Sequence, residues 1–402
     1  MMTINEKINK WINIVIYTLF ILLFYSFSRR GGDVLSYSIL GIILMVFLQM
    51  IVKKKYNFFN YVSLTGTVYL LLLSCLFFNS ENIRENLDIF LGMTVYSIVF
   101  MFFIANYEID IKYYKYIIPL FSLSSIGPIY RGIKDMVENY KILSYYRIAA
   151  GTYTTVYALE LGIYFLVGII GILYNKNKLI KYIYLVYVLL VSILIIHTQS
   201  RTTMLGIILP LFLLLVLWNC KKGSIMFITI ILFIGILYSS FPNFKPFVRA
   251  KTLIGIEKIE RTPRYPIFKR GIEIGIENKY KGVGFYFYKD KNFVVDSLQG
   301  SKFSHFHNII VETFATQGLL ITLSFVGFLL ALFIKLIKNY FESQENRELK
   351  ILGIVVFIFG IIYGISEPIF YFTKLYELIF IIIGISLSVG NNDKGKVQRI
   401  DC

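Results

Sequence analysis

The sequence predicts an all-α, polytopic membrane protein of about twelve transmembrane helices with one long extracytoplasmic loop. Hydrophobic residues make up 57% of the 402 residues, charged residues only 16%, and the mean hydropathy is +0.68. That composition is too apolar for a soluble chain of this length. The apolar residues are gathered in runs, most of them near the length that crosses a hydrocarbon core of about 30 Å. One polar stretch of about 65 residues interrupts these runs, and long loops of this kind commonly carry recognition and chemistry.

Twelve apolar runs are expected to cross the membrane, and they divide the chain into three parts. Residues 1–240 hold the first nine, residues 241–308 form the long loop, and residues 309–402 hold the last three and a cytoplasmic tail. The run 114–128 is short and contains two prolines; if it did not cross, every later loop would change sides. The runs are 11–27, 34–52, 58–78, 87–105, 114–128, 154–174, 182–197, 203–219, 224–240, 309–334, 351–366 and 368–389.

The distribution of basic residues predicts the orientation. With the N-terminus inside, the inner segments hold 19 Lys and Arg residues, whereas the short outer segments and membrane ends hold 9. Short cytoplasmic loops are enriched in these residues, so we expect both termini in the cytoplasm and the long loop outside the cytoplasmic membrane. The net charge of +17 lies largely in inner loops, where topology and anionic lipid explain it without nucleic acid.

The long loop also has an excess of basic residues, although the charge rule for short loops does not apply to it. An anionic ligand or lipid head group is one explanation, and a solvated lysine-rich surface is the other. Residues 264–277 predict a short amphipathic helix with Pro266 in its first turn. Arg264 stands at its N-terminus, where free N–H groups and the helix dipole favour an anion, and Arg261 lies one turn earlier. The expected apolar stripe, suited to a membrane surface, is Phe268, Ile272 and Ile276.

Two short motifs follow this helix. Gly282 and Gly284 allow a tight turn or the close approach of the backbone to a ligand. His305 and His307 lie at the expected outer membrane edge, and Asn308 begins the next helix one turn before Glu312.

His307 is a candidate general acid or base, and ordinary interfacial histidine is the alternative. A His-x-His pair can bind metal, but no Asp, Glu or Cys nearby in the sequence completes a set, so neither a metal nor another cofactor is expected. His197 lies within an apolar helix end and is expected to pack there.

Arg201 stands at the outer end of an apolar run, between Ser200 and Thr202. An arginine facing lipid near mid-bilayer is costly, so its side chain either extends to the interface or has a functional partner. The planar guanidinium matches the geometry of phosphate, which makes a phosphate-bearing lipid the expected partner.

From about Arg147 to Gly318, the order and spacing of these motifs resemble the O-antigen ligase and polymerase superfamily of bacterial polysaccharide assembly. The resemblance implies an inverting, metal-independent glycosyltransferase of the helical membrane (GT-C-like) type, with a glycan on undecaprenyl diphosphate as donor. It implies that Arg201 and Arg264 hold the diphosphate and that His307 acts on the acceptor hydroxyl. The matching segments are Arg147 to Gly151, Ser200 to Thr202, the arginine around Arg264, Gly282 to Gly284, and His307-Asn308 with Glu312 and Gly318. The expected substrate-binding residues are Arg147, Arg261, Gly282, Gly284, His305, Asn308 and Glu312.

The sequence is compatible with three functions. A polymerase would extend capsule, O-antigen or exopolysaccharide from lipid-linked repeat units; a ligase would move the finished glycan onto a lipid A core or another acceptor. A flippase for a lipid-linked sugar would show related half-repeats and ionisable residues near mid-bilayer. The expected partners are the lipid-linked donor and acceptor, membrane lipid, and a chain-length regulator and flippase of the same pathway.

Overall fold

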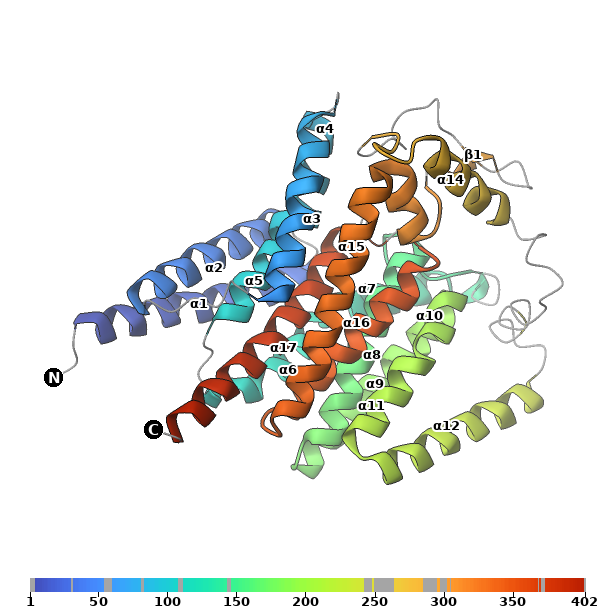
Figure 1. Cartoon of the computed structure of the whole chain (residues 1–402). Helices are drawn as coiled ribbons and strands as arrows, with labels where there is room; N and C mark the ends of the chain where they lie inside the picture. Colours follow the sequence, from blue (N-terminus) through green and yellow to red (C-terminus); the bar gives the residue numbers. More distant parts are fainter. Residues whose placement is uncertain are drawn as a thin grey trace.

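The computed structural model describes residues 4–29, 32–53, 60–80, 83–107, 111–142, 146–241, 248, 264–284, 295–296, 302–303, 305–367, 369 and 373–400. Within these residues the chain is a helical bundle (Figure 1), which confirms the all-α prediction apart from one two-residue antiparallel strand pair. The first part of the chain contains α1 (Ile4–Arg29), α2 (Gly32–Lys53), α3 (Tyr61–Phe78), α4 (Ile83–Met93), the π-helix η1 (Thr94–Val99), α5 (Phe100–Asn106), α6 (Ile111–Ser124), α7 (Ile126–Glu138), the 3-10 helix η2 (Tyr140–Ile142), α8 (Thr154–Tyr174), α9 (Lys178–Thr198), α10 (Arg201–Gly206), α11 (Ile208–Trp218) and α12 (Cys220–Ser240). The remainder contains α14 (Tyr265–Glu277), β1 (Val295–Asp296), β2 (Lys302–Phe303), α15 (Ile309–Glu342), α16 (Arg347–Gly364) and α17 (Thr373–Ile400).

Nine helical stretches among the described residues are long and apolar enough to cross a membrane. The chain is therefore a multi-pass membrane protein, while the expected count of twelve stays a prediction. These stretches are Glu6–Arg29, Gly32–Lys53, Tyr61–Phe78, Asn86–Asn106, Thr154–Tyr174, Lys178–Thr198, Arg201–Trp218, Cys220–Ser240 and Ile309–Glu342.

The expected run 114–128 is not one of them, because the helix breaks near its end. α6 stops at Ser124, and its 14 residues span only about 21 Å, less than the hydrocarbon core. The amphipathic α7 then lies against the end of α1. Gly127 N–H donates to Ser28 Oγ at 3.0 Å, and Arg131 Nη1 donates to Ser28 O at 2.8 Å. Pro128 has no N–H to donate to the carbonyl of Ser124, so the helix ends there, and contacts between segments about 100 residues apart hold α7 in place.

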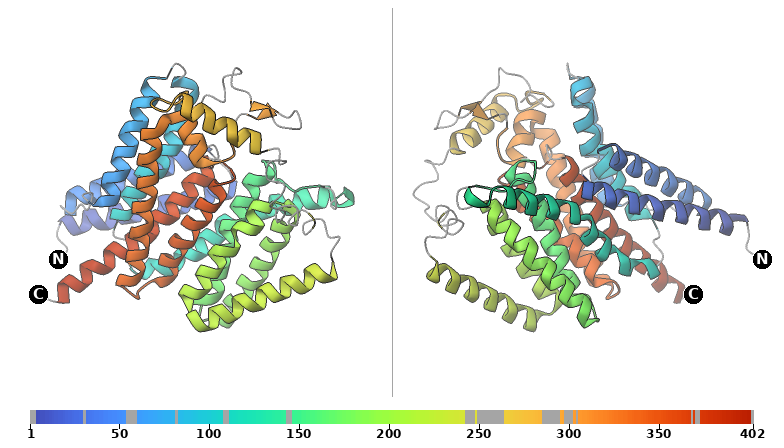
Figure 2. Two further views of the ribbon diagram at one scale, coloured as in Figure 1. Left: turned by 45° about the vertical axis from the view of Figure 1, so that its right-hand side comes forward. Right: turned by 180° about the vertical axis from the view of Figure 1, so that it is seen from behind.

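α15, α16 and α17 run through the middle of the bundle, and α8 packs against α16 (Figure 1). α12, by contrast, packs on α11 and otherwise lies along the outside of the bundle, where its apolar side chains are exposed (Figure 2). That exposure is expected for a helix surrounded by lipid.

Two hydrogen bonds tie together the ends of α8, α10 and α16. Tyr363 donates its hydroxyl to Thr155 O at 2.5 Å, and Ser366 Oγ donates to Thr202 Oγ1 at 3.1 Å. These ends meet on the side of the bundle that carries α14 and the beginning of α15 (Figure 1).

The predicted helix at 264–277 is confirmed as α14, but its buried face differs from the expected stripe. The ring of Phe268 and the side chain of Ile276 are exposed. α14 instead packs on the first turns of α15, where Gly271 and Gly275 let the rings of Phe306 and Phe314 lie against its backbone. The buried face consists of Ile267, Gly271, Ile274 and Gly275.

Gly282 fixes the end of α14 to a break in α15. Gly318, inside α15, has φ 82° and ψ 173°, which interrupts the helix. Backbone carbonyls just before this break accept hydrogen bonds from the segment that contains Gly282 and Gly284. Val283 N–H donates to Ala315 O at 2.9 Å, and Gly284 N–H donates to Thr316 O at 3.0 Å. The close backbone approach expected at Gly282 is therefore made to α15.

Replacing Gly282 with alanine should destabilise this junction by about 2 kcal/mol or more. Gly282 has φ +65°, and an added Cβ would lie 2.3 Å from Thr316 O, a backbone atom that cannot rotate away. The measurement is thermal unfolding of the purified protein in detergent. Gly327→Ala in α15 is the control, because its Cβ meets nothing within 4 Å. Equal unfolding temperatures for the two variants would contradict the role of Gly282.

Candidate active site

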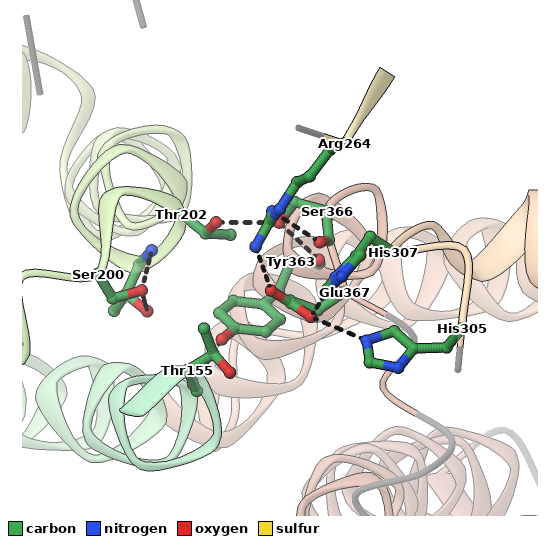
Figure 3. Close-up of polar contacts among 10 residues, drawn as sticks. Thr155, Ser200, Thr202, Arg264, His305, His307, Tyr363, Ser366 and Glu367 are labelled. Atoms are coloured by element: carbon green, nitrogen blue, oxygen red, sulfur yellow. Dashed lines mark hydrogen bonds and ion pairs between the residues drawn. The ribbon is translucent and has the colours of Figure 1, made fainter. Parts of the chain in front are cut away.

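Glu367, just beyond α16, is the centre of a polar cluster formed by three distant segments (Figure 3). Its side chain is only 3% exposed. Oε1 accepts a hydrogen bond from Arg264 Nη2 at 2.6 Å, and Oε2 lies 3.0 Å from His307 Nδ1 and 3.9 Å from His305 Nε2. We call Arg264, His305, His307 and Glu367 the Glu367 cluster.

Arg264 lies at the N-cap of α14, as predicted, but its guanidinium is directed at the end of α16. Nη1 donates to Ser366 O at 3.1 Å while Nη2 makes the ion pair with Glu367. A guanidinium has five N–H donors, so donors remain for a further anion. The side chain is 43% exposed, and substrate can therefore reach it.

His307 adopts a left-handed backbone conformation with φ +53°. Such a conformation costs about 1–2 kcal/mol for a residue with a Cβ and is common at functional sites. The following residue holds the turn: Asn308 Oδ1 accepts from the N–H groups of Ile310 and Val311, and its Nδ2 donates to Ile365 O at 2.9 Å. Asn308 therefore joins the start of α15 to the end of α16, next to Glu367.

The electrostatics of the cluster favour an ionised carboxylate and a neutral His305. Burial raises the pKa of Glu367, but the hydrogen bond from His307 and the charges of Arg264 and the two histidines outweigh it and leave that pKa below its usual value. Burial lowers the pKa of His305 to about 4. Because an ionised carboxylate only accepts hydrogen bonds, it selects the His307 tautomer with the proton on Nδ1, which leaves the lone pair on Nε2.

Arg201 lies at the turn between α9 and α10, and Arg147, from the segment before α8, is bonded to this turn. Arg201 is the first residue of α10, directly before Thr202, whose hydroxyl contacts the residue preceding Glu367. Arg147 Nε donates to Thr198 O at 3.0 Å. Arg201 thus begins the helix whose second residue contacts the segment of Glu367, and Arg147 is joined to the end of α9 next to it.

Asp135 in α7 holds the segment that carries Arg147. Its Oδ2 accepts hydrogen bonds from the N–H groups of Ala149 and Ala150, at 2.8 Å and 2.9 Å. Burial raises the pKa of Asp135, but these hydrogen bonds and those from Tyr146 and Asn139 lower it overall. The fixed carboxylate orders the backbone around Ala150, which has φ +50°.

The other predicted substrate-binding residues have structural contacts of their own. Glu312 is buried, and its Oε2 accepts from Phe306 N–H at 2.7 Å, which fixes the segment between the two histidines. Gly284 donates its N–H to α15, and Gly282 lies against the α15 backbone, as described above. Arg261 lies outside the described residues. The direct role of these residues in substrate binding stays a prediction.

Glu367 is the residue that the sequence argument missed. No third ligand lies near the two histidines in the sequence, but the fold supplies one: donor atoms of His305, His307 and Glu367 all lie within 4.8 Å of one another. The expectation that no metal is needed stays a prediction. Glu367 is 60 residues further along the chain. One signal was available: it is the acidic residue between the runs 351–366 and 368–389, at the end expected to face the long loop.

Comparison with known protein families finds a match over part of the chain. Residues 185–326 match the O-antigen ligase family. The predicted resemblance to the O-antigen ligase and polymerase superfamily is confirmed. No curated protein sequence is similar enough to the chain to count as a match.

The matched stretch runs from α9 into α15, so it contains Arg201, Arg264 and His307. Glu367 lies beyond it. The match to the O-antigen ligase family implies a glycosyltransferase-like membrane enzyme and, in general terms, lipid-linked glycan substrates.

Proposed function

We propose that the protein is an inverting, metal-independent glycosyltransferase that polymerises undecaprenyl-diphosphate-linked repeat units on the outer face of the cytoplasmic membrane. The observation that carries the proposal is the Glu367 cluster, which combines an oriented imidazole with a partly exposed guanidinium. These are the two groups that glycosyl transfer from a lipid diphosphate requires: a base for the acceptor and a cation for the leaving group.

The proposed reaction is a single displacement at the anomeric carbon. His307 Nε2 takes the proton of the acceptor hydroxyl as its oxygen forms the new bond to that carbon. The anomeric C–O bond to the diphosphate breaks, and the electron pair leaves with the phosphate oxygen. Attack from the face opposite the leaving group inverts the configuration. A base of this kind contributes about 10²–10⁴-fold to the rate.

The charges around His307 support both halves of this step. Glu367 accepts from Nδ1, so it fixes the basic tautomer and stabilises the imidazolium that forms. Arg264 has donors left after its bonds to Glu367 and Ser366, and Arg201 lies on the neighbouring helix start. Two guanidinium groups already in position stabilise the negative charge that grows on the diphosphate.

A ligase is the second candidate, because the family that matches residues 185–326 is described as O-antigen ligase. Both activities use the same donor and the same displacement, so the Glu367 cluster serves either one. They differ in the acceptor, which is a lipid-linked repeat unit for the polymerase and a lipid A core for the ligase.

The test supplies the purified protein in detergent with lipid-diphosphate-linked repeat units, alone or with lipid A core. We expect a ladder of elongated lipid-linked products. Transport across a membrane cannot be scored in detergent, whereas glycosyl transfer can, so these products would report transfer. His307→Ala should lower the rate about 10²–10⁴-fold. His197→Ala is the control, because it removes the remaining histidine, which lies near the end of α9 and is not part of the Glu367 cluster. Transfer only to the lipid A core would assign the ligase instead, and full activity in His307→Ala would overturn the mechanism.

A further inference from the structure

We infer that His305, His307 and Glu367 form an inhibitory binding site for a divalent transition-metal ion such as Zn²⁺. Two imidazole nitrogens and one carboxylate oxygen are a ligand set that suits zinc, with a water completing the four positions. The donor atoms come from two segments of the fold, before α15 and after α16, and all lie within 4.8 Å of one another. The binding itself is independent of the proposed function; only its inhibitory effect rests on it.

The distances permit an ion after small side-chain movements. Ligand atoms around a tetrahedral zinc with bonds near 2.0 Å lie about 3.3 Å apart. Here His307 Nδ1 lies 3.0 Å and His305 Nε2 lies 3.9 Å from Glu367 Oε2. The two imidazole rings are already close, with their centroids 4.2 Å apart. Each contact thus needs a change of less than about 2 Å to reach zinc geometry.

Arg264 supports the carboxylate as a ligand. It holds Oε1 of Glu367, whereas Oε2 is the oxygen that faces both histidines. Ligating carboxylates are usually hydrogen-bonded by an outer group that fixes their orientation, and Arg264 fills that position. Its positive charge also weakens the site, because it repels the ion. We therefore expect reversible binding in place of a permanently held metal.

Zinc bound to His307 prevents this residue from acting as the base, because the metal changes which ring nitrogen carries the proton. In the structure His307 Nδ1 lies against Glu367, so the proton is on Nδ1 and the lone pair is on Nε2. A metal on Nδ1 takes the lone pair of that atom, and the single proton of the neutral ring then resides on Nε2. Nε2 can no longer accept the proton of the acceptor hydroxyl. Occupancy of the site therefore stops transfer without blocking the donor arginines.

The binding test uses full-length protein with its three cysteines replaced by serine, since thiolates bind zinc themselves. After dialysis against ZnCl₂, elemental analysis should find one zinc per chain, and Co²⁺ should give the visible absorption of a four-coordinate site. His305→Ala and the bulkier His305→Gln should each weaken binding at least tenfold, while His197→Ala should bind as the parent does. No specific zinc in the parent protein, or equal binding in the His305 variants, would overturn the site.

The activity test follows transfer as ZnCl₂ is raised, with each protein compared with its own metal-free rate. We expect reversible inhibition of the parent, restored by a chelator, and at least a tenfold higher inhibitory concentration for the His305 variants. Zinc that binds at one equivalent without lowering transfer would overturn the inhibitory role. If His307→Ala kept full transfer activity while the parent still bound zinc, the proposed role of His307 as the base would fail and the metal site would stand.

Discussion

Replacing Glu367 with glutamine should lower the rate of glycosyl transfer about 10²–10⁴-fold while the protein stays folded. The glutamine side chain has the same shape but only one oxygen, and both Arg264 and His307 need an acceptor. If the amide oxygen faces Arg264, the amide NH₂ donates to His307 Nδ1. The histidine proton then moves to Nε2, and the base is lost.

The measurement is the initial rate of product formation from lipid-linked donor, with folding checked by gel filtration in detergent. Glu377→Gln is the matched control, because it also replaces a buried glutamate with its amide, on α17 and outside the Glu367 cluster. We expect that control to stay within about threefold of the parent rate, since it touches none of the reacting groups. Equal losses in both variants would show that Glu367 acts only through stability.

The difference in stability between the parent and Glu367→Gln should depend on pH, in a direction that the pKa of Glu367 determines. The pKa of Glu367 is lower in the folded protein than its usual value, so ionised Glu367 contributes stability above about pH 4.3. That contribution is lost as the pH falls through the pKa that Glu367 has in the folded protein. The gap in unfolding temperature between the parent and Glu367→Gln should therefore be constant near neutral pH and shrink below about pH 4. A gap that did not change with pH would contradict the ionised state.

Replacing Arg264 with alanine should lower transfer about 10²–10³-fold, because it removes a preorganised cation at the leaving phosphate. It also removes the guanidinium that is bonded to Glu367 Oε1. Arg264→Lys should recover only part of the loss, since an ammonium group cannot bridge Ser366 O, Glu367 and a phosphate in one plane.

Arg270→Ala is the control on the same helix. Arg270 is 47% exposed and makes surface ion pairs with Glu273 and Glu277. Such pairs contribute little, so we expect its rate to stay within about twofold of the parent. Rates are compared at saturating donor and over a donor titration, because loss of a phosphate ligand should appear in kcat as well as in KM. If Arg270→Ala lowered the transfer rate as much as Arg264→Ala, the loss would reflect the overall charge of α14 and would contradict a specific role of Arg264.

The sequence predicted the parts of this protein that depend on local pattern. Apolar run lengths indicated a multi-pass helical fold, and Pro266 with the residues that follow indicated α14. Residue chemistry singled out Arg264 and His307, which the fold brings to one carboxylate. The buried face of α14 could not be predicted, because it depends on Phe306 and Phe314 of a later segment. The position of α7 depends in the same way on the end of α1.

The composition and the pattern of apolar runs alone determined that this chain is a membrane-embedded helical bundle with a basic loop between its last groups of helices. In lipid the backbone N–H and C=O groups must be hydrogen-bonded within the protein, and helices satisfy them. Only the tertiary structure decided that Glu367 is the group on which Arg264 and both histidines converge. A carboxylate at a helix end carries no local sign of its partners. It gains them when α14, α15 and α16 pack together and burial makes an unpaired charge too costly to keep.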